Sequence, residues 1–168
     1  MKYQKIVVCL LIFSLFSCAT KSNFSKNNLN QEYFKGKTIV FSINENSVKS
    51  IKKSGPSMGV ERQPNINETF NESVAQLAQE TKINLKVKYF KNQTINDSEI
   101  NVDAEITDIS WIFNLSSATM VSTINYKIGD KIYKKVGLYK NMSGGSEKRN
   151  LIRSLKTAHY SLLQELQK

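Results

Sequence analysis

Three acidic residues fall close together in the chain, at Asp103, Glu105 and Asp108. They lie in a segment whose apolar and polar residues alternate, so that Asp103 and Glu105 would share one face of a β-strand. Two carboxylates at that spacing could serve a hydrolase such as a glycosidase, or bind calcium. We favour the alternative of a solvated strand face whose acids pair with lysines on neighbouring strands.

His159 is the only histidine, so a Ser–His–Asp triad or a Cys–His pair would have to use it. It lies four residues after Leu155 and three before Leu162, beside the apolar stripe of a predicted helix. A structural histidine on the flank of that helix is the better interpretation. A zinc site built on several histidines is excluded. We expect no metal and no cofactor, and no catalytic set of residues.

A glycine-rich segment, Gly144-Gly145-Ser146, precedes the last predicted helix. Lys148 and Arg149 fall in the first turn, where positive charge opposes the helix dipole. An anion bound at the helix N-terminus would relieve that clash. The segment matches neither a phosphate-binding loop nor a dinucleotide-binding pattern. An ordinary loop with Ser146 as the helix cap is the simpler interpretation.

Basic and aromatic residues are predicted to share the outward face of the sheet. Four lysines alternate with apolar positions and three aromatic residues join them: Lys86, Lys88, Lys127, Lys135, Tyr133, Tyr139 and Trp111. Lysines can contact phosphate, and aromatic rings offer apolar area with a polar edge. The face could bind a ligand with acyl and phosphate groups, or a partner protein. The alternative is a solvated face whose edge lysines discourage strand pairing.

The N-terminus has the layout of an export signal. Lys2 and Lys5 precede an apolar run over residues 6–16, within the usual length of a signal core and short for a membrane span. The run ends in Leu15-Phe16-Ser17-Cys18, which resembles the signal of bacterial lipoproteins. The resemblance implies that the Cys18 thiol is acylated and becomes the first residue of the mature protein. Ala19 follows where an inner-membrane lipoprotein would carry aspartate, which implies the outer membrane.

Composition agrees with one anchored domain. No acidic run follows Cys18, so we expect the periplasmic leaflet, and Cys9, the other cysteine, lies within the signal. No disulfide is then expected. The net charge of +10 would suggest nucleic acid for a cytoplasmic protein, but an exported one meets anionic lipids and glycans instead. We assign 1–17 to the signal, 18–36 to a flexible tether and 37–168 to a single domain.

Periodicity predicts the elements of that domain. Strands are expected over 38–43, 83–89, 99–115 and 118–128, and helices from Asn65 to Lys82 and from Ser146 onward. The long segment between 44 and 65 could hold an extra hairpin with 48–53 as one arm. The apolar residues of 99–115 change face midway, which predicts a bulge near Thr107-Asp108.

The final strand is predicted to return through a tight turn at Gly129-Asp130. The apolar residues of this strand are Ile132, Val136 and Leu138, and we expect them to face the core. The order β-α-β-β-β-α with two apolar helix stripes predicts a two-layer α+β sandwich, mostly antiparallel, with both helices on one face.

An acylation signal followed by this order of elements resembles small envelope lipoproteins, such as the lipopolysaccharide-assembly lipoprotein family and the auxiliary lipoproteins of lipid-transporting ABC systems. The resemblance lies at the level of the fold. It implies a non-enzymatic accessory or binding protein for an envelope partner or an anionic lipid-like ligand. An immunity-type protective lipoprotein and a hydrolase using Asp103, Glu105 and Asp108 remain the alternatives.

Overall fold

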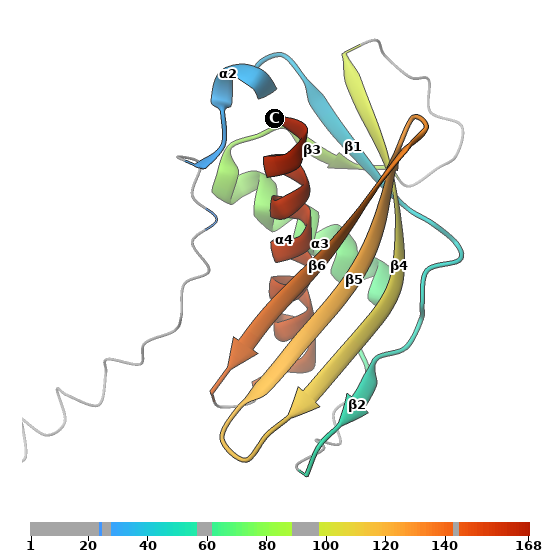
Figure 1. Ribbon diagram of the computed structural model, residues 1–168, viewed down its shortest axis with the longest axis vertical. Helices are drawn as coiled ribbons and strands as arrows, with labels where there is room; N and C mark the ends of the chain where they lie inside the picture. Colours follow the sequence, from blue (N-terminus) through green and yellow to red (C-terminus); the bar gives the residue numbers. More distant parts are fainter. Residues whose placement is uncertain (1–23, 25–27, 57–61, 89–97, 143–144) are drawn as a thin grey trace, which may run out of the picture.

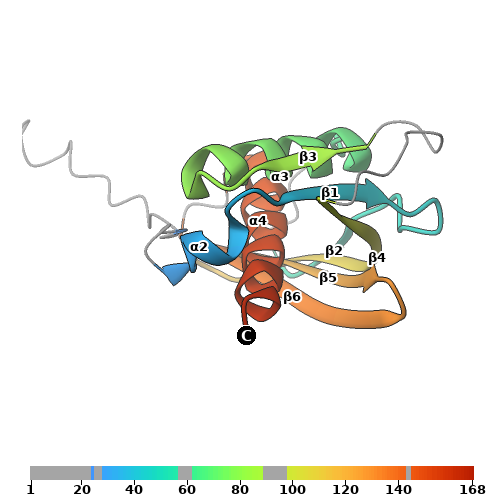
Figure 2. The same cartoon turned by 90° about the horizontal axis from the view of Figure 1, so that it is seen from above.

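The computed structural model describes residues 24, 28–56, 62–88, 98–142 and 145–168. Within these residues one six-stranded sheet carries two long helices on one face (Figures 1 and 2). In chain order the elements are α2 (Gln31–Phe34), β1 (Thr38–Ile43), β2 (Lys52–Ser54), α3 (Ile66–Thr81), β3 (Leu85–Val87), β4 (Glu99–Phe113), β5 (Ala118–Ile128), β6 (Lys131–Asn141) and α4 (Glu147–Leu166). The predicted α+β fold is confirmed, but the predicted order β-α-β-β-β-α is not, since β2 also precedes α3 and four strands follow it.

The sheet is mixed rather than mostly antiparallel. Its order is β3-β1-β4-β5-β6, and β2 lies beside the second half of β4. The pairs β1–β3, β1–β4 and β2–β4 are parallel, whereas β4–β5 and β5–β6 are antiparallel. The chain passes from β1 through β2 and helix α3 to β3, and such a crossover returns it in the same direction. The segment 48–53 contributes β2 to this sheet and forms no hairpin with its neighbours among the described residues.

The bulge predicted in β4 is confirmed. The pairing of β4 with β5 shifts register between Ile106 and Asp108. Val102 and Ile106 before the shift and Ile109 and Trp111 after it all face the buried core. One extra residue reverses the alternation of a strand, which lets both halves of β4 use the same face.

The predicted orientation of β6 is wrong. Ile132, Val136 and Leu138 are 67%, 53% and 55% exposed and point away from the helices. The two-residue turn places Ile128 opposite Lys131 and therefore Tyr126 opposite Tyr133. Directly opposed residues of an antiparallel pair share a face. Since Tyr126 is buried, the odd-numbered residues of β6 face the helices and the even-numbered ones face outward.

Gly137 enforces the same orientation. A Cβ atom at this position would lie 1.9 Å from the Ser154 carbonyl oxygen of α4 and 2.8 Å from Ser122 Oγ of β5. The Ser154 hydroxyl donates to the Gly137 carbonyl oxygen at 3.0 Å and lies 2.9 Å from Ser122 Oγ. Three small residues thus allow α4 to approach the sheet so closely that only glycine fits on β6.

The segment assigned to a tether needs a correction, because its second half belongs to the domain. Leu29 and Phe34 are buried in the core. The Asn30 N–H donates to Gln167 Oε1 at 2.6 Å, and the Phe24 ring lies 5.4 Å from that of Tyr160 near the end of α4. The signal, Cys18 and the first residues after it lie outside the described residues.

Both long helices begin as predicted. The Asn65 side chain accepts hydrogen bonds from the N–H groups of Asn67 and Glu68, and Ser146 accepts one from Arg149. Their apolar stripes meet over the sheet, where α3 contacts β1 and β3 and α4 contacts β5 and β6. The buried residues of these stripes are Ile66, Phe70, Val74 and Leu77 on α3, and Leu151, Leu155, Ala158, Leu162 and Leu163 on α4.

We predict that Gly137→Ala lowers the free energy of unfolding by about 2–3 kcal/mol, because the added methyl group clashes with the α4 backbone. The neighbouring exposed change Val136→Thr serves as the matched control and should stay within about 0.5 kcal/mol. Urea denaturation of both variants gives the comparison. Equal stability of the two would mean that Gly137 does not face α4.

Candidate functional site

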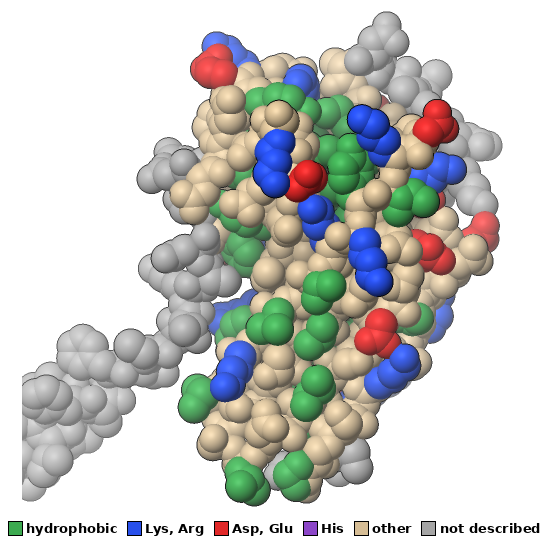
Figure 3. All heavy atoms as spheres, viewed as in Figure 1, with side chains coloured by type: hydrophobic (Ala, Val, Ile, Leu, Met, Phe, Trp, Pro, Cys, Tyr) green, Lys and Arg blue, Asp and Glu red, His purple; other side chains and the backbone are tan. Residues whose placement is uncertain are grey.

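The outer face of the sheet, on the side away from the helices, exposes apolar side chains of β4 and β6. Five cross-strand rows make up what we call the outer face of β4–β6: Ile112–Thr119–Lys140, Ser110–Val121–Leu138, Asp108–Thr123–Val136, Glu105–Asn125–Lys134 and Asp103–Lys127–Ile132. Figure 3 shows hydrophobic side chains grouped over β5 and β6 on this side of the molecule. Large apolar side chains exposed together are typical of interaction surfaces.

Charge is distributed unevenly across this face. The β4 edge carries Asp103, Glu105 and Asp108, and the β6 edge carries Lys134 and Lys140. The β5 column between them contributes no charge until Lys127, near the turn into β6. The face therefore has an acidic side and a basic side, separated by threonine, valine and asparagine.

Asp103 and Glu105 share one face, as predicted, and the bulge places Asp108 on the same face. Asp108 and Asp103 have local hydrogen-bond partners. Asp108 accepts hydrogen bonds from Lys52 Nζ at 2.6 Å and Ser110 Oγ at 2.8 Å, and the bond from Lys52 is the main reason that its pKa is lowered. Asp103 accepts from Asn44 Nδ2 at 2.8 Å and lies directly across from Lys127. Among the described residues, no group of three or more His, Cys, Asp or Glu side chains could hold a metal ion.

The predicted basic and aromatic face is divided between the two sides of the sheet, which corrects that prediction. Trp111 is buried in the core, since the β4 bulge turns it inward. Tyr133, Lys135 and Tyr139 face α4 because of the orientation of β6. Lys135 contacts Glu165 at 3.4 Å, and the Tyr139 ring lies 4.8 Å beneath the Arg153 guanidinium, which donates a hydrogen bond to the Tyr139 hydroxyl.

Three of the predicted lysines, Lys86, Lys88 and Lys127, do lie on the outward side of the sheet. Lys86 pairs with Val40 of β1, and Lys127 pairs with Asp103 of β4. Lys88 follows β3, where its N–H donates to the Phe41 carbonyl oxygen at 2.8 Å. The strands β1 and β4 separate Lys86 and Lys88 from Lys127. Without the aromatic residues, these lysines do not form one site.

His159 is fully buried and connects three elements of the core. Ser73 Oγ donates to the Phe70 carbonyl oxygen at 2.6 Å, so its single proton is used there. His159 Nε2–H therefore donates to Ser73 Oγ at 2.9 Å, and Nδ1 accepts the Tyr126 hydroxyl at 2.6 Å. Burial lowers the pKa of His159 to about 3 and raises that of Tyr126. A neutral histidine sealed by aromatic rings serves as a structural junction, in line with the structural interpretation.

The N-terminus of α4 has an internal counterion. Glu147 in its first turn is buried and pairs with Lys53 at 2.6 Å, and Lys53 lies 5.5 Å over the Trp111 ring. Lys148 pairs with Glu72 of α3 at 2.7 Å. These contacts place negative charge beside the first turn of α4, where Lys148 would otherwise oppose the helix dipole, and a bound anion is not required for this. Of the predicted loop, Gly144 lies outside the described residues.

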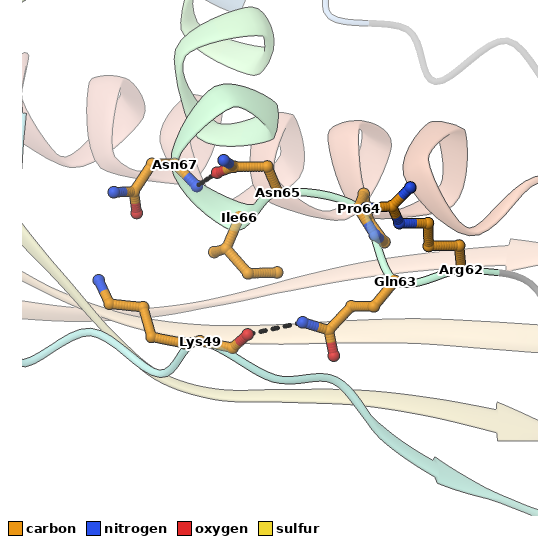
Figure 4. A pocket seen from close by; sticks show the side chains of 7 residues that line it. All are labelled: Lys49, Arg62, Gln63, Pro64, Asn65, Ile66 and Asn67. Atoms are coloured by element: carbon orange, nitrogen blue, oxygen red, sulfur yellow. Dashed lines mark hydrogen bonds between the residues drawn. The ribbon is translucent and has the colours of Figure 1, made fainter.

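Two surface cavities accompany these features. The larger, of about 590 Å³, lies at the start of α3 and is lined by Lys49, Arg62, Gln63, Pro64, Asn65, Ile66 and Asn67 (Figure 4). Its wall is tied together by the Gln63 amide, which donates to the Lys49 carbonyl oxygen at 2.6 Å. The Asn65 side chain already accepts the first N–H groups of α3. The groups of this cavity that could contact an anion are the exposed side chains of Lys49 and Arg62.

A smaller cavity of about 430 Å³ lies between α2 and the end of α3. Lys35, Lys37 and Lys82 line it, but Lys35 contacts Glu32 at 3.5 Å and Lys37 lies 3.6 Å over the Tyr33 ring. Both lysines thus have partners within α2. Within the described residues, no helix is both long enough and apolar enough to cross a membrane.

Comparison with known proteins identifies no family for this chain. No protein-family model matches the chain, and no curated protein matches it. One similar solved structure is titled "Crystal structure of uncharacterized protein", at 6% identity and a TM-score of 0.41, covering 78% of this chain and 90% of that one. Another is the hypothetical protein CT253 from Chlamydia trachomatis, at 14% identity and a TM-score of 0.37, covering 77% and 93%. Neither likeness bears on function.

The buried histidine makes stability depend on pH. An unfolded histidine takes up a proton near pH 6.5, whereas folded His159 does so only near pH 3, so this group stabilises the fold above pH 6.5 and destabilises it progressively below. His159→Phe should cost about 2 kcal/mol at pH 7, because the Tyr126 hydroxyl loses its acceptor. The difference between wild type and variant should then fall by roughly 1.4 kcal/mol per pH unit below 6.5, so that it reaches zero at about pH 5 and the variant is the more stable protein at pH 4.

Urea denaturation of both proteins between pH 7 and pH 4 measures that difference. The carboxylates titrate in both proteins and cancel in the comparison. A difference that stays constant over this range would show that His159 is not held neutral.

Proposed function

We propose that this chain is a non-enzymatic envelope lipoprotein that uses the outer face of β4–β6 to bind a protein partner. Acylated Cys18 would hold it at the periplasmic side of the outer membrane. The observation that carries the proposal is the exposure of Val136 and Leu138 on the β6 side of that face. Large apolar side chains that are exposed next to one another mark interaction sites, whereas singly scattered ones do not.

The shape of the surface favours a protein partner over a small anionic lipid. A sheet face of three strands and five rows is broad. Small ligands prefer concave sites that bury most of their surface. The lysines expected to bind phosphate are divided between the two sides of the sheet, whereas the exposed apolar residues of β6 lie along one strand.

The anchor would hold the domain close to the membrane. Phe24 packs against Tyr160 near the end of α4, so five residues separate it from Cys18. The six Cα–Cα steps between Cys18 and Phe24 span at most about 20 Å. The end of the domain that carries α2 and the C-terminus would therefore lie next to the bilayer surface, and the outer face of β4–β6 would stand roughly upright beside it.

We predict that Cys18→Ala releases the folded protein from the membrane. The acyl chains would supply most of the membrane affinity, since each buried methylene contributes about 0.8 kcal/mol. The measurement is the distribution of the protein between membrane and soluble envelope fractions, with Ser17→Ala as the control that keeps the thiol. A Cys18→Ala protein that still sediments with membranes would contradict the proposed anchor.

A photo-reactive amino acid in place of Val136 tests the surface itself. Irradiation of intact cells should give one discrete cross-linked product, identified by mass spectrometry. The matched control is the same substitution at Gln79, which is exposed on α3 away from the sheet face. Products of equal yield from both positions would exclude the outer face as the binding surface.

A further inference from the structure

The outer face of β4–β6 has the charge layout of a self-complementary surface. Its β4 column carries three acids, of which Asp108 is paired with Lys52. Its β6 column carries Lys134 and Lys140 beside exposed apolar residues. Binding to a uniformly charged partner would leave one side of this face opposed to its own sign. A partner with the mirrored layout would satisfy both sides.

A second copy of the chain has that layout when a twofold axis runs along β5. Rotation by 180° about this axis turns the second face toward the first and exchanges its columns. Each β4 then lies over the β6 of the other copy, while the two β5 strands face one another. Such a contact is isologous, so every favourable pair occurs twice.

We propose that the outer face of β4–β6 binds a second copy of this chain about a twofold axis parallel to β5. This rests on the proposed function, since it names the partner of the same surface. Glu105 of each copy faces Lys134 of the other, because both belong to the row Glu105–Asn125–Lys134. Val121 lies in the β5 column close to the axis, where it meets its own counterpart beside Leu138.

The size of the face decides the strength of the contact. Three strands and five rows measure roughly 14 by 34 Å at normal sheet spacings. Two copies would bury roughly 1,000 Å², the lower limit for a specific interface. The two Lys127 side chains also lie near the axis, although each is directly opposite Asp103 of its own chain. The dimer is therefore weak in solution.

Anchoring overcomes that weakness. An axis parallel to the strands leaves both copies pointing the same way, so both N-terminal segments emerge toward one membrane. Lys135 near the start of β6 contacts Glu165 near the end of α4, which places the start of β6 at the same end of the domain as Asn30 and Gln167. Two copies held in one bilayer have a raised effective concentration, and this favours a weak contact.

Pairing through the free edge of β6 fits the structure less well. The Leu138 carbonyl oxygen accepts a hydrogen bond from Thr157 Oγ1 at 3.4 Å, and the Gly137 carbonyl oxygen accepts one from Ser154. Helix α4 thus uses backbone groups near the middle of that strand. Stacking of two sheets face to face leaves these bonds in place.

Cross-linking of single cysteines in native membranes tests the proposal. Val121→Cys should give a dimer with a short bifunctional thiol reagent, whereas Gln79→Cys on α3 should not. Glu105→Lys or Lys134→Glu, each combined with Val121→Cys, should lower the dimer yield about tenfold, because like charges then oppose one another twice across the interface. Mixing the two charge variants in one cell should restore the yield, since both cross-pairs become attractive in the mixed dimer.

Each other outcome has a defined meaning. No more dimer from Val121→Cys than from Gln79→Cys, or no restoration on mixing, overturns the second copy as partner. A cross-linked product with a different protein overturns it too, yet leaves the proposed function intact. A product from the chain without an added cysteine would show that the Cys18 thiol is free, and the proposed anchor would fail instead.

Discussion

The close approach of α4 to β6 at Gly137 is the contact on which the surface of this protein depends. A side chain at that position would overlap the α4 backbone, so Gly137 must face the helix. Because successive residues of a strand point to opposite faces, the neighbours Val136 and Leu138 must face outward. One steric requirement thus buries Tyr139 beneath Arg153 and exposes the apolar residues that make the outer face a binding surface.

The buried junction around His159 holds the layers in that relation. Ser73 comes from α3, His159 from α4 and Tyr126 from β5, and their hydrogen bonds run in one direction to the Phe70 carbonyl oxygen. Each of these polar side-chain atoms in the junction has a partner, which removes the penalty for burying it. Because the donors and acceptors must match, the junction also defines the rotation of both helices over the sheet. The histidine that could have suggested catalysis serves to position α4 against β5 and α3.

Much of the architecture could be predicted from local patterns. The helix caps at Asn65 and Ser146, the bulge near Thr107-Asp108 and the two-residue turn at Gly129-Asp130 all depend on near neighbours in sequence. The parallel pairing of β1 with both β3 and β4 depends on where distant segments meet, and no local pattern reports it. The short α2 and the burial of Leu29 were missed for a similar reason, since their polar surroundings resemble a linker until the end of α4 covers them.

The sequence by itself determined the class of fold and the position of most elements. It also excluded a metal site built on several histidines, because His159 is the only histidine. It also contained the signal for the orientation of β6, because a two-residue turn after Ile128 places Tyr133 opposite Tyr126. Hydrophobicity alone predicts the opposite orientation of β6, with the apolar side chains of Ile132, Val136 and Leu138 facing the core. Only the tertiary structure decided between the two, because the clash of any side chain at Gly137 with α4 arises between segments that are distant in the chain.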